Sequence, residues 1–112
     1  MATFLTTIDT SSEIERLILN AKSKLVLVTP YLKMSRLLHE RIQDANKNGI
    51  SITLIYGKCE LQPEQWEKLS NLENVRIYFC DNLHAKCYHN GEQMIISSMN
   101  LFIIGPPPRT GL

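Results

Sequence analysis

The sequence predicts an α/β fold: βαβαβα units that form a mixed, mostly parallel sheet flanked by helices, followed by a β-hairpin. Segments with the spacing of an amphipathic helix alternate with short apolar runs rich in β-branched residues, which is the order of a sheet with crossover helices. Near the end, two strand-like runs at 84–88 and 93–98 are separated by a short segment that contains Asn90 and Gly91. An Asn-Gly pair between two such runs is a strong hairpin signal.

Three helices are expected between the strands. Residues 10–22 begin with capping-box residues and continue with apolar residues at i, i+3, i+4 and i+7. Ser35 can cap the second helix, and Gly49 suits the position just after its end. Pro63 fits the first turn of the third helix, and we expect Trp66 in that helix to be a packing residue rather than a platform for a nucleobase.

Residues 25–28, 50–56 and 75–79 are expected to be strands. The first lacks polar alternation, which is typical of a strand buried on both faces, and Pro30 is expected to end it. A short N-terminal strand around residues 3–6 is compatible with the sequence. The length of 112 residues fits one domain, expected at residues 1–101. Residues 102–112 are expected to be an extended or disordered tail, because their three prolines block a helix.

The composition is that of an ordinary soluble protein, with 44% hydrophobic and 21% charged residues. No apolar run approaches the roughly 18 residues that span a bilayer, and the N-terminus lacks the features of a signal peptide. We therefore expect a cytoplasmic protein without a membrane partner. The three cysteines form no C-x-x-C pair, which favours reduced, partly buried thiols. A net charge of +1 decides nothing about nucleic acid, since binding requires only a local basic groove.

The chemistry is expected at the hairpin. On a strand, His84 and Lys86 share one face, so an imidazole and an ammonium point to the same side. The cation can hold phosphate oxygens while the neutral imidazole attacks phosphorus. Ser98 and Asn100, at the end of the returning strand, can add hydroxyl and amide donors. This arrangement needs matching parity across the hairpin, and therefore a loop of odd length with Gly91 in a left-handed conformation, or a bulge.

Four further residues follow the expected parallel strands. Tyr31 and Lys33 come after the first strand, and Tyr56 and Lys58 end the second. Ligands of open α/β sheets bind at the carboxyl ends of the strands, so we expect these side chains to contact the substrate. For Tyr31 and Tyr56, a packing role is as compatible with the sequence as a substrate contact. The lysines, with Arg36 as an outer contact, would form the local basic groove.

His-x-Lys, a hairpin and then Ser-x-Asn resemble the HKD motif of the phospholipase D superfamily. Residues 25–33 and 52–58 also resemble the strand ends of bacterial phospholipase D-like nuclease domains, and the resemblance covers roughly residues 3–101. It implies a phosphodiesterase, most simply a nuclease, that needs no metal or cofactor. His84 would be the nucleophile that forms a phosphohistidine, or the acid; Lys86 and Asn100 would bind the phosphate. Ser98 would be a supporting donor, and a homodimer would supply the second histidine.

Two departures from the family pattern keep an alternative open. The family has an aspartate seven residues after the histidine, where this chain has Gly91, with Asn90 and Glu92 as the nearest substitutes. The family also continues beyond the asparagine into a helix and a strand, whereas here three prolines follow. The alternative is an inactive or truncated module that binds phosphate or nucleic acid. A lipid phosphodiesterase is disfavoured, because no amphipathic membrane-binding stretch is present.

A zinc site is an alternative use of Cys80, His84, Cys87 and His89, which lie close together in the sequence. Their spacing matches no usual zinc motif, and strand alternation separates His84 from Cys87. The cysteines are better interpreted as small buried hydrophobes. His39 is expected at the surface, and His89 in a solvated turn facing away from His84.

Overall fold

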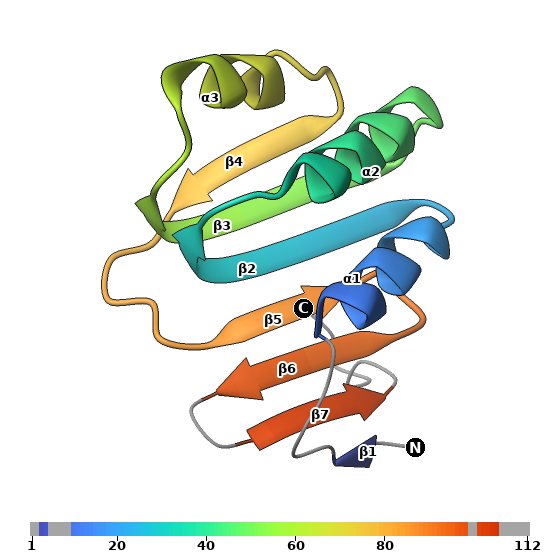
Figure 1. The fold of residues 1–112 in the computed structure, drawn as a ribbon. Coiled ribbons are helices and arrows are strands. Elements are labelled where there is room, and N and C mark those ends of the chain that lie inside the picture. Colours follow the sequence, from blue (N-terminus) through green and yellow to red (C-terminus); the bar gives the residue numbers. More distant parts are fainter. Residues whose placement is uncertain (1–2, 5–9, 99–100, 106–112) are drawn as a thin grey trace.

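The computed structural model describes residues 3–4, 10–98 and 101–105 (Figure 1). In chain order the elements are β1 (Thr3–Phe4), α1 (Thr10–Leu19), β2 (Lys24–Leu32), α2 (Arg36–Lys47), β3 (Ser51–Cys59), α3 (Pro63–Ser70), β4 (Val75–Phe79), β5 (Lys86–His89), β6 (Met94–Ser98) and β7 (Leu101–Gly105). None of the described helices is long and apolar enough to cross a membrane.

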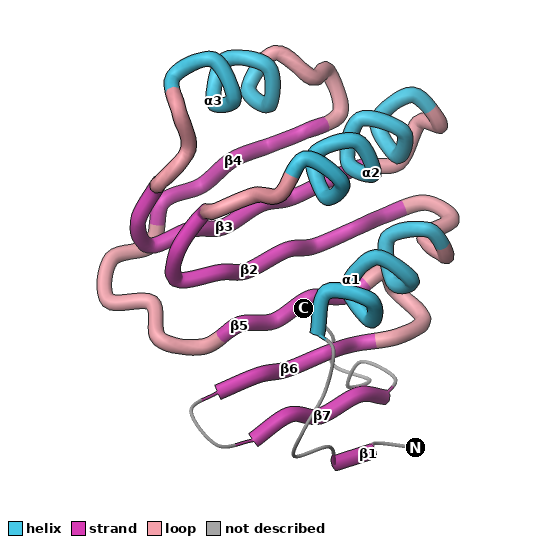
Figure 2. The backbone as a smooth tube through the Cα atoms, viewed as in Figure 1, coloured by secondary structure: helices cyan, strands magenta, loops and turns pink. Residues whose placement is uncertain are grey.

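The strands form one mixed sheet in the order β1-β7-β6-β5-β2-β3-β4. The β2–β3 and β3–β4 pairings are parallel, and the remaining pairings are antiparallel. Following these pairings, β1, β2, β3, β4 and β6 run in one direction, and β5 and β7 run in the other. Figure 2 shows these strands side by side in one sheet. The predicted α/β class, a mixed sheet flanked by helices with a hairpin after the βαβ units, is confirmed, although four of the six described strand pairings are antiparallel and only two are parallel.

One face of the sheet packs against the helices. Leu25 and Leu27 of β2 are 0% and 4% exposed, whereas Val26 and Val28 on the opposite face are only half-buried. β3 repeats the same alternation. All three helices contribute residues to the cluster that contains these buried strand residues, so α1, α2 and α3 lie over the same face. The core is formed by Leu17, Ile18, Leu25, Leu27, Leu32, Met34, Ile42, Ala45, Ile50, Ile52, Leu54, Leu69, Tyr88 and Ile95.

The expected helix ends are confirmed for α2 and α3. The Leu38 backbone N–H donates to Ser35 Oγ at 3.1 Å, which caps α2. Gly49 follows the α2 C-cap with φ +78°, and Pro63 occupies the first turn of α3. α1 ends at Leu19, earlier than the predicted residue 22.

β2 continues through Pro30, where the sequence predicted its end. The antiparallel pairing with β5 stops at Val28, so no strand on that side requires an N–H from residue 30. The register with β3 likewise passes from Thr29 to Tyr31. β2 and β3 therefore both extend beyond the predicted ranges, to Leu32 and Cys59.

The hairpin differs from the predicted geometry. His89 pairs with Met94 and Lys86 pairs with Ser97, so the connection has an even length, residues 90–93. The predicted odd-length loop is therefore wrong, although Gly91 does have a positive φ of 91°. The Asn90 side chain explains the longer turn: its Oδ1 accepts from the Glu92 and Gln93 backbone N–H groups at 3.0 and 2.8 Å. This Asx-type turn closes with the Asn90 N–H donating to the Gln93 carbonyl at 3.2 Å.

Several predicted environments are corrected. His89 is the last residue of β5 and is 1% exposed, not a solvated turn residue, because β5 is longer at this end than the hairpin prediction allowed. His39 is 8% exposed, since its side of α2 faces α3. Cys59 and Cys80 are exposed, because each comes at or after a strand end outside the core; Cys87 is half-buried.

The C-terminal boundary also differs from the prediction at residue 101. Leu101–Gly105 forms β7 and pairs with β6 on one side and β1 on the other. Its apolar, β-branched run suits a strand, and the prolines begin only after Gly105. The rest of the predicted tail, residues 106–112, lies outside the described residues. The N-terminal strand is present as Thr3–Phe4.

Candidate functional site

The predicted residues converge on one edge of the sheet. β2, β3 and β4 are parallel, so their carboxyl ends share this edge. β5 runs in the opposite direction and begins there, and β6 runs back and ends there. Figure 1 shows the arrowheads of β2, β3, β4 and β6 and the start of β5 at the same side. The topology therefore brings together segments from five strands, as the sequence predicted for residues 31, 56 and 84.

A crossing segment, residues 80–85, connects β4 to β5 around this edge. Its start is fixed by the Cys80 N–H, which donates to the Tyr56 carbonyl at 2.8 Å. Its middle is fixed by Leu83, which packs on Gly57: a Cβ added to Gly57 would lie 3.4 Å from Leu83 Cβ and 2.8 Å from the Pro30 carbonyl oxygen. The absence of a side chain at Gly57 thus lets the crossing segment lie close to β2 and β3.

His84 follows Leu83 directly and is exposed. It lies just before β5 rather than within it, because β5 begins at Lys86. Lys86 is exposed, and continuing the Val28↔Cys87 register by one residue brings it level with Thr29 of β2. Lys86 therefore lies beside the carboxyl-terminal part of β2, and His84 directly follows Leu83, which packs at the ends of β2 and β3.

The register of the returning strand differs from the predicted one. The register places Ser97, not Ser98, opposite Lys86. Ser98 is the last residue of β6 and pairs with Leu101 of β7. The predicted matching parity of Ser98 and Lys86 is thus wrong within the ladder, because the turn contains an even number of residues. Asn100 lies outside the described residues.

Tyr31 and Lys58 are direct neighbours across β2 and β3. Tyr31 is 53% exposed, and Lys58 and Lys33 are also exposed. Among the described residues, no ion pair includes Lys33, Lys58 or Lys86. Their ammonium groups thus remain available for an anion at this edge.

Tyr56 has a packing role. Its ring is half-buried and makes edge contacts with Trp66 and Phe79, with ring centroids 5.8 and 5.6 Å apart. Trp66 is therefore a packing residue, as predicted. Phe79 is 61% exposed at the same edge and was missed by the sequence reasoning. The sequence could have indicated Phe79 as a site residue, because it is the last residue of the 75–79 strand and lies at that strand's carboxyl end.

Asn90 stands near the position of the family's aspartate and anchors the hairpin. It is 5% exposed, and its Nδ2 donates to the Leu17 carbonyl of α1 at 2.9 Å. With the two N–H groups on its Oδ1, this amide joins α1 to the β5–β6 turn. Asn90 can therefore take over a structural role of the missing aspartate, whereas Glu92 is exposed and paired with Lys22 at 3.1 Å.

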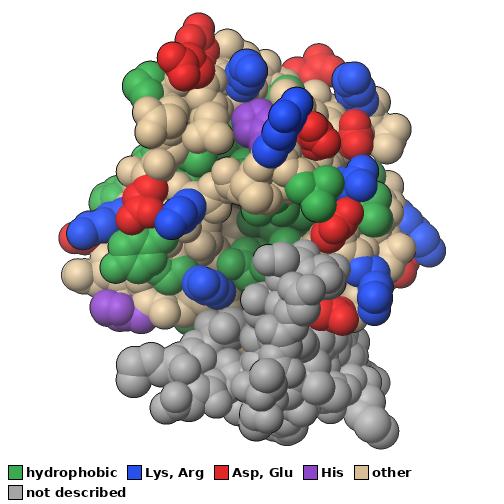
Figure 3. All heavy atoms as spheres, viewed as in Figure 1, with side chains coloured by type: hydrophobic (Ala, Val, Ile, Leu, Met, Phe, Trp, Pro, Cys, Tyr) green, Lys and Arg blue, Asp and Glu red, His purple; other side chains and the backbone are tan. Residues whose placement is uncertain are grey.

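On the face in Figure 3, Lys and Arg side chains lie among Asp and Glu side chains over the described part of the molecule. Within the described ranges, no group of three or more His, Cys, Asp or Glu side chains could hold a metal ion. The described side chains at the edge include an imidazole, lysine ammonium groups and aromatic rings.

This fold, with its edge site at the start of an antiparallel strand, is that of the phospholipase D superfamily. The chain belongs to the family described as cardiolipin synthase, PLD-like domain, whose model matches residues 14–103. No curated protein matches the sequence.

Solved structures share the fold at low sequence identity. NucT from Helicobacter pylori is 13% identical with a TM-score of 0.76, over 98% of this chain and 87% of that chain. Nuc from Salmonella typhimurium, a phospholipase D family member, is 12% identical with a TM-score of 0.67, over 98% and 84%. TrmBL2, an archaeal chromatin protein, is 10% identical with a TM-score of 0.68. The alignment covers 97% of this chain but only 44% of TrmBL2.

Proposed function

We propose that this protein is a metal-independent phosphodiesterase that cleaves nucleic acid, with His84 as the nucleophile and a homodimer completing the site. The observation that carries the proposal is the route of the crossing segment. Leu83 packs on Gly57 at the Pro30 carbonyl, and the next residue is an exposed histidine beside the β2 and β3 ends. An imidazole at a strand edge with nearby lysines has the parts that phosphoryl transfer requires.

In the first step, a nitrogen of the neutral His84 imidazole attacks phosphorus. A P–N bond forms and the P–O bond to the leaving alcohol breaks. His84 of the partner subunit donates a proton to that leaving oxygen, acting as general acid. In the second step water attacks phosphorus, the P–N bond breaks, and the partner's His84 takes the proton. The net reaction is hydrolysis of the diester.

The remaining residues bind the substrate in this proposal. Lys86 holds the oxygens of the scissile phosphate, with Asn100 as a further donor. Lys33 and Lys58 contact neighbouring phosphates, and Tyr31 contacts the substrate beside them. The exposed ammonium groups of Lys33, Lys58 and Lys86, without ion-pair partners in the described residues, support this assignment. Tyr56 contributes to substrate binding indirectly, through the edge contacts of its ring with Phe79 and Trp66.

The single histidine-lysine pair per chain motivates the homodimer. Two His84 side chains would meet across a two-fold axis, where each contacts the same phosphate. The low exposure of His39 and His89, at 8% and 1%, leaves His84 as the exposed histidine of this chain. The second imidazole must therefore come from another copy if two are needed.

A second candidate is binding without cleavage. TrmBL2, which shares the fold, is a chromatin protein with a described mode of DNA binding. The replacement of the family's aspartate and the shifted Ser98 register also favour this alternative. Under it, the lysine edge binds phosphate but no bond is broken.

The test is cleavage of a labelled oligonucleotide in excess EDTA. The wild-type protein is expected to cleave, and His84→Ala is expected to lose at least about a thousand-fold in kcat. Lys86→Ala is expected to lose activity, whereas Lys47→Ala, an exposed lysine at the far end of α2, is the matched control and keeps it. Cleavage by His84→Ala, or a strict need for added metal, would refute the mechanism. Oligonucleotide binding without any cleavage would favour the second candidate.

A further inference from the structure

The helix layer contains a groove between α2 and α3 that the proposed reaction does not use. It is lined by Arg36, His39, Glu40, Gln43, Gln65 and Lys68. We call it the α2–α3 groove. Its residues come from the first turns of α2 and the first two turns of α3. Both helices directly follow strands whose carboxyl ends lie at the candidate site, so the first turns of both helices are the parts of the helix layer connected to that edge.

We propose that the α2–α3 groove binds a second phosphate of the nucleic-acid substrate, separate from the phosphodiester that is cleaved. The inference rests on the proposed function for its substrate class. Anion binding follows from the charge of the groove. Its lining contains two cationic side chains, Arg36 and Lys68, and one carboxylate, Glu40. A guanidinium and an ammonium on one concave surface are the usual protein ligands of a phosphate.

His39 is the strongest sign of a missing partner. Its side chain lines the groove, it is 8% exposed, and its Nε2 has no hydrogen-bond partner among the described residues. A buried polar atom without a partner is unfavourable, so such atoms are rare in native structures. Burial, and next the charge of Lys68, lower the pKa of His39, so its imidazole is neutral at neutral pH. A neutral imidazole that carries its proton on Nε2 can donate to a phosphate oxygen.

The amide groups complete the donor set. Gln65 Oε1 accepts from the Gln62 backbone N–H at 3.2 Å in the capping box of α3. This bond fixes the carbonyl side of the amide and leaves the Gln65 NH₂ group for another acceptor. The Arg36 side chain is 95% exposed and contacts Glu40 only at 3.6 Å, so it can turn onto a ligand at little cost.

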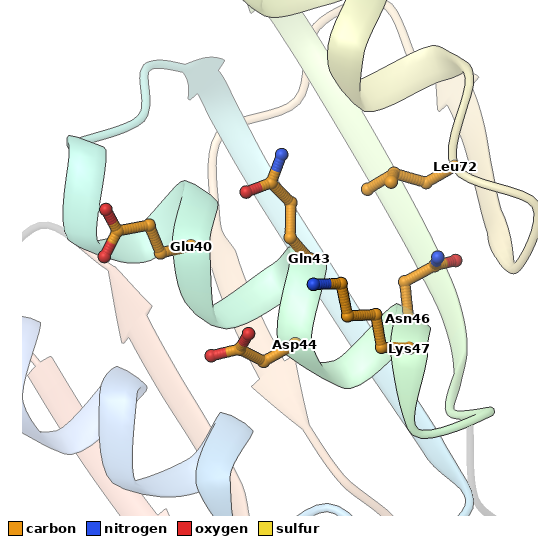
Figure 4. A pocket seen from close by; sticks show the side chains of 6 residues that line it. All are labelled: Glu40, Gln43, Asp44, Asn46, Lys47 and Leu72. Atoms are coloured by element: carbon orange, nitrogen blue, oxygen red, sulfur yellow. The ribbon is translucent and has the colours of Figure 1, made fainter.

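The neighbouring hollow indicates which end of α2 an anion prefers. It is lined by Glu40, Gln43, Asp44, Asn46, Lys47 and Leu72. Figure 4 shows Glu40 and Asp44 along one side of α2 and Leu72 on the segment after α3. Two carboxylates and one ammonium disfavour a phosphate there. The anion site is therefore assigned to the end near Arg36 and Lys68.

The test uses the full chain carrying His84→Ala, so that binding is measured without cleavage. The probes are inorganic phosphate and a twelve-residue oligothymidylate, followed by the imidazole NMR signals of His39 and His89. Both probes are expected to shift the His39 signal and leave His89 unmoved, with tighter binding of the oligonucleotide. A His39 shift with phosphate but not with the oligonucleotide would show a free-anion site and overturn the substrate assignment. No His39 shift with either probe would overturn the site.

Kinetics of the otherwise unmodified protein separate this proposal from the proposed function. Arg36→Ala with Lys68→Ala is expected to raise KM for the oligonucleotide about ten-fold with unchanged kcat, because uniform binding is lost. Bis(p-nitrophenyl) phosphate, which has a single phosphate, should be hydrolysed as before. Lys47→Ala is the matched control. An unchanged KM in the double variant while His84→Ala is inactive would refute the groove alone. Cleavage by His84→Ala would refute the proposed mechanism and leave the binding result standing.

Discussion

Gly57 faces the carbonyl oxygen of Pro30 so closely that an added Cβ would lie 2.8 Å from it. The same added Cβ would lie 3.4 Å from Leu83 Cβ, and Leu83 is one residue before His84. This contact joins the β3 end, the β2 end and the crossing segment. The position of the histidine therefore depends on a residue that has no side chain.

Gly57→Ala is expected to impair activity more than stability. The new methyl group must displace Pro30 or Leu83, with an overpacking cost of about 1–3 kcal/mol, and it moves His84 with the crossing segment. The kcat for an oligonucleotide is expected to fall at least about ten-fold at a temperature where the protein remains folded.

Gly49→Ala is the matched control for Gly57→Ala. Gly49 has φ +78° and no atom within 4 Å of an added Cβ, so the substitution introduces backbone strain of about 1–2 kcal/mol far from the edge site. Urea unfolding should detect both substitutions, whereas only Gly57→Ala should lower kcat. Equal activity of the two variants would contradict the role assigned to the Gly57–Leu83 contact.

Asn90→Ala is expected to destabilise the fold by about 2–4 kcal/mol, because three hydrogen bonds of a 5% exposed amide are lost and the Leu17 carbonyl loses its donor. Asn90→Asp keeps the two bonds to the turn but removes the donor to Leu17, so it should lie between the wild type and Asn90→Ala. Urea unfolding measures both, with Asn71→Ala, at an exposed position, as control. A change below about 0.5 kcal/mol for Asn90→Ala would contradict the anchoring role.

Stability is expected to fall in mild acid. Burial lowers the pKa of His39 and of His89, and the charges of Lys68 and Lys24 add to the two effects. In the unfolded chain both groups return to about 6.5, so the unfolded state binds more protons below that pH. The stability is therefore complete above pH 6.5 and is lost as the pH falls, by at most about 1.4 kcal/mol per pH unit for each histidine.

Thermal unfolding between pH 5 and 8 measures this dependence. The Tm should be constant above pH 7 and decrease below 6.5. His39→Gln with His89→Gln should flatten the decrease, since neither amide titrates. A double variant that keeps the full wild-type slope would assign the acid lability to other groups.

The homodimer makes activity depend on concentration. If each site needs His84 of the partner subunit, specific activity should fall when the protein is diluted below the dimer dissociation constant. Sedimentation velocity at the same concentrations measures the dimer fraction. Constant specific activity in a range where only monomer sediments would rule out a shared site.

Much of the fold follows from local patterns in the sequence. The Ser35 cap, Gly49 and Pro63 each have a physical preference for the position that they occupy, and all three were predicted correctly. The strand at residues 75–79 was also predicted with its exact ends. The predicted end of β2 at Pro30 was wrong, because a proline is tolerated where no neighbouring strand needs its N–H. Only the order of the strands in the sheet shows that this is the case here.

The candidate site was predictable only in part. That residues 31, 56 and 84 reach one edge follows from the alternation of parallel strands and a hairpin. The parity of Ser98 and Lys86 depends on the turn length, which the buried Asn90 side chain sets through contacts with α1 that sequence spacing does not reveal. The burial of His39 and His89 likewise results from tertiary packing. The role of Gly57 became visible only with the path of the crossing segment.

The central claim, that His84 is the nucleophile, is tested most directly by trapping the intermediate. The protein is mixed in EDTA with an oligonucleotide carrying a labelled phosphate, quenched in alkali within one turnover, digested and analysed by mass spectrometry. If His84 is the nucleophile, a phosphoramidate adduct is expected on the peptide that contains His84, and none is expected in His84→Ala. Cleavage without any adduct, or an adduct on another residue, would contradict it.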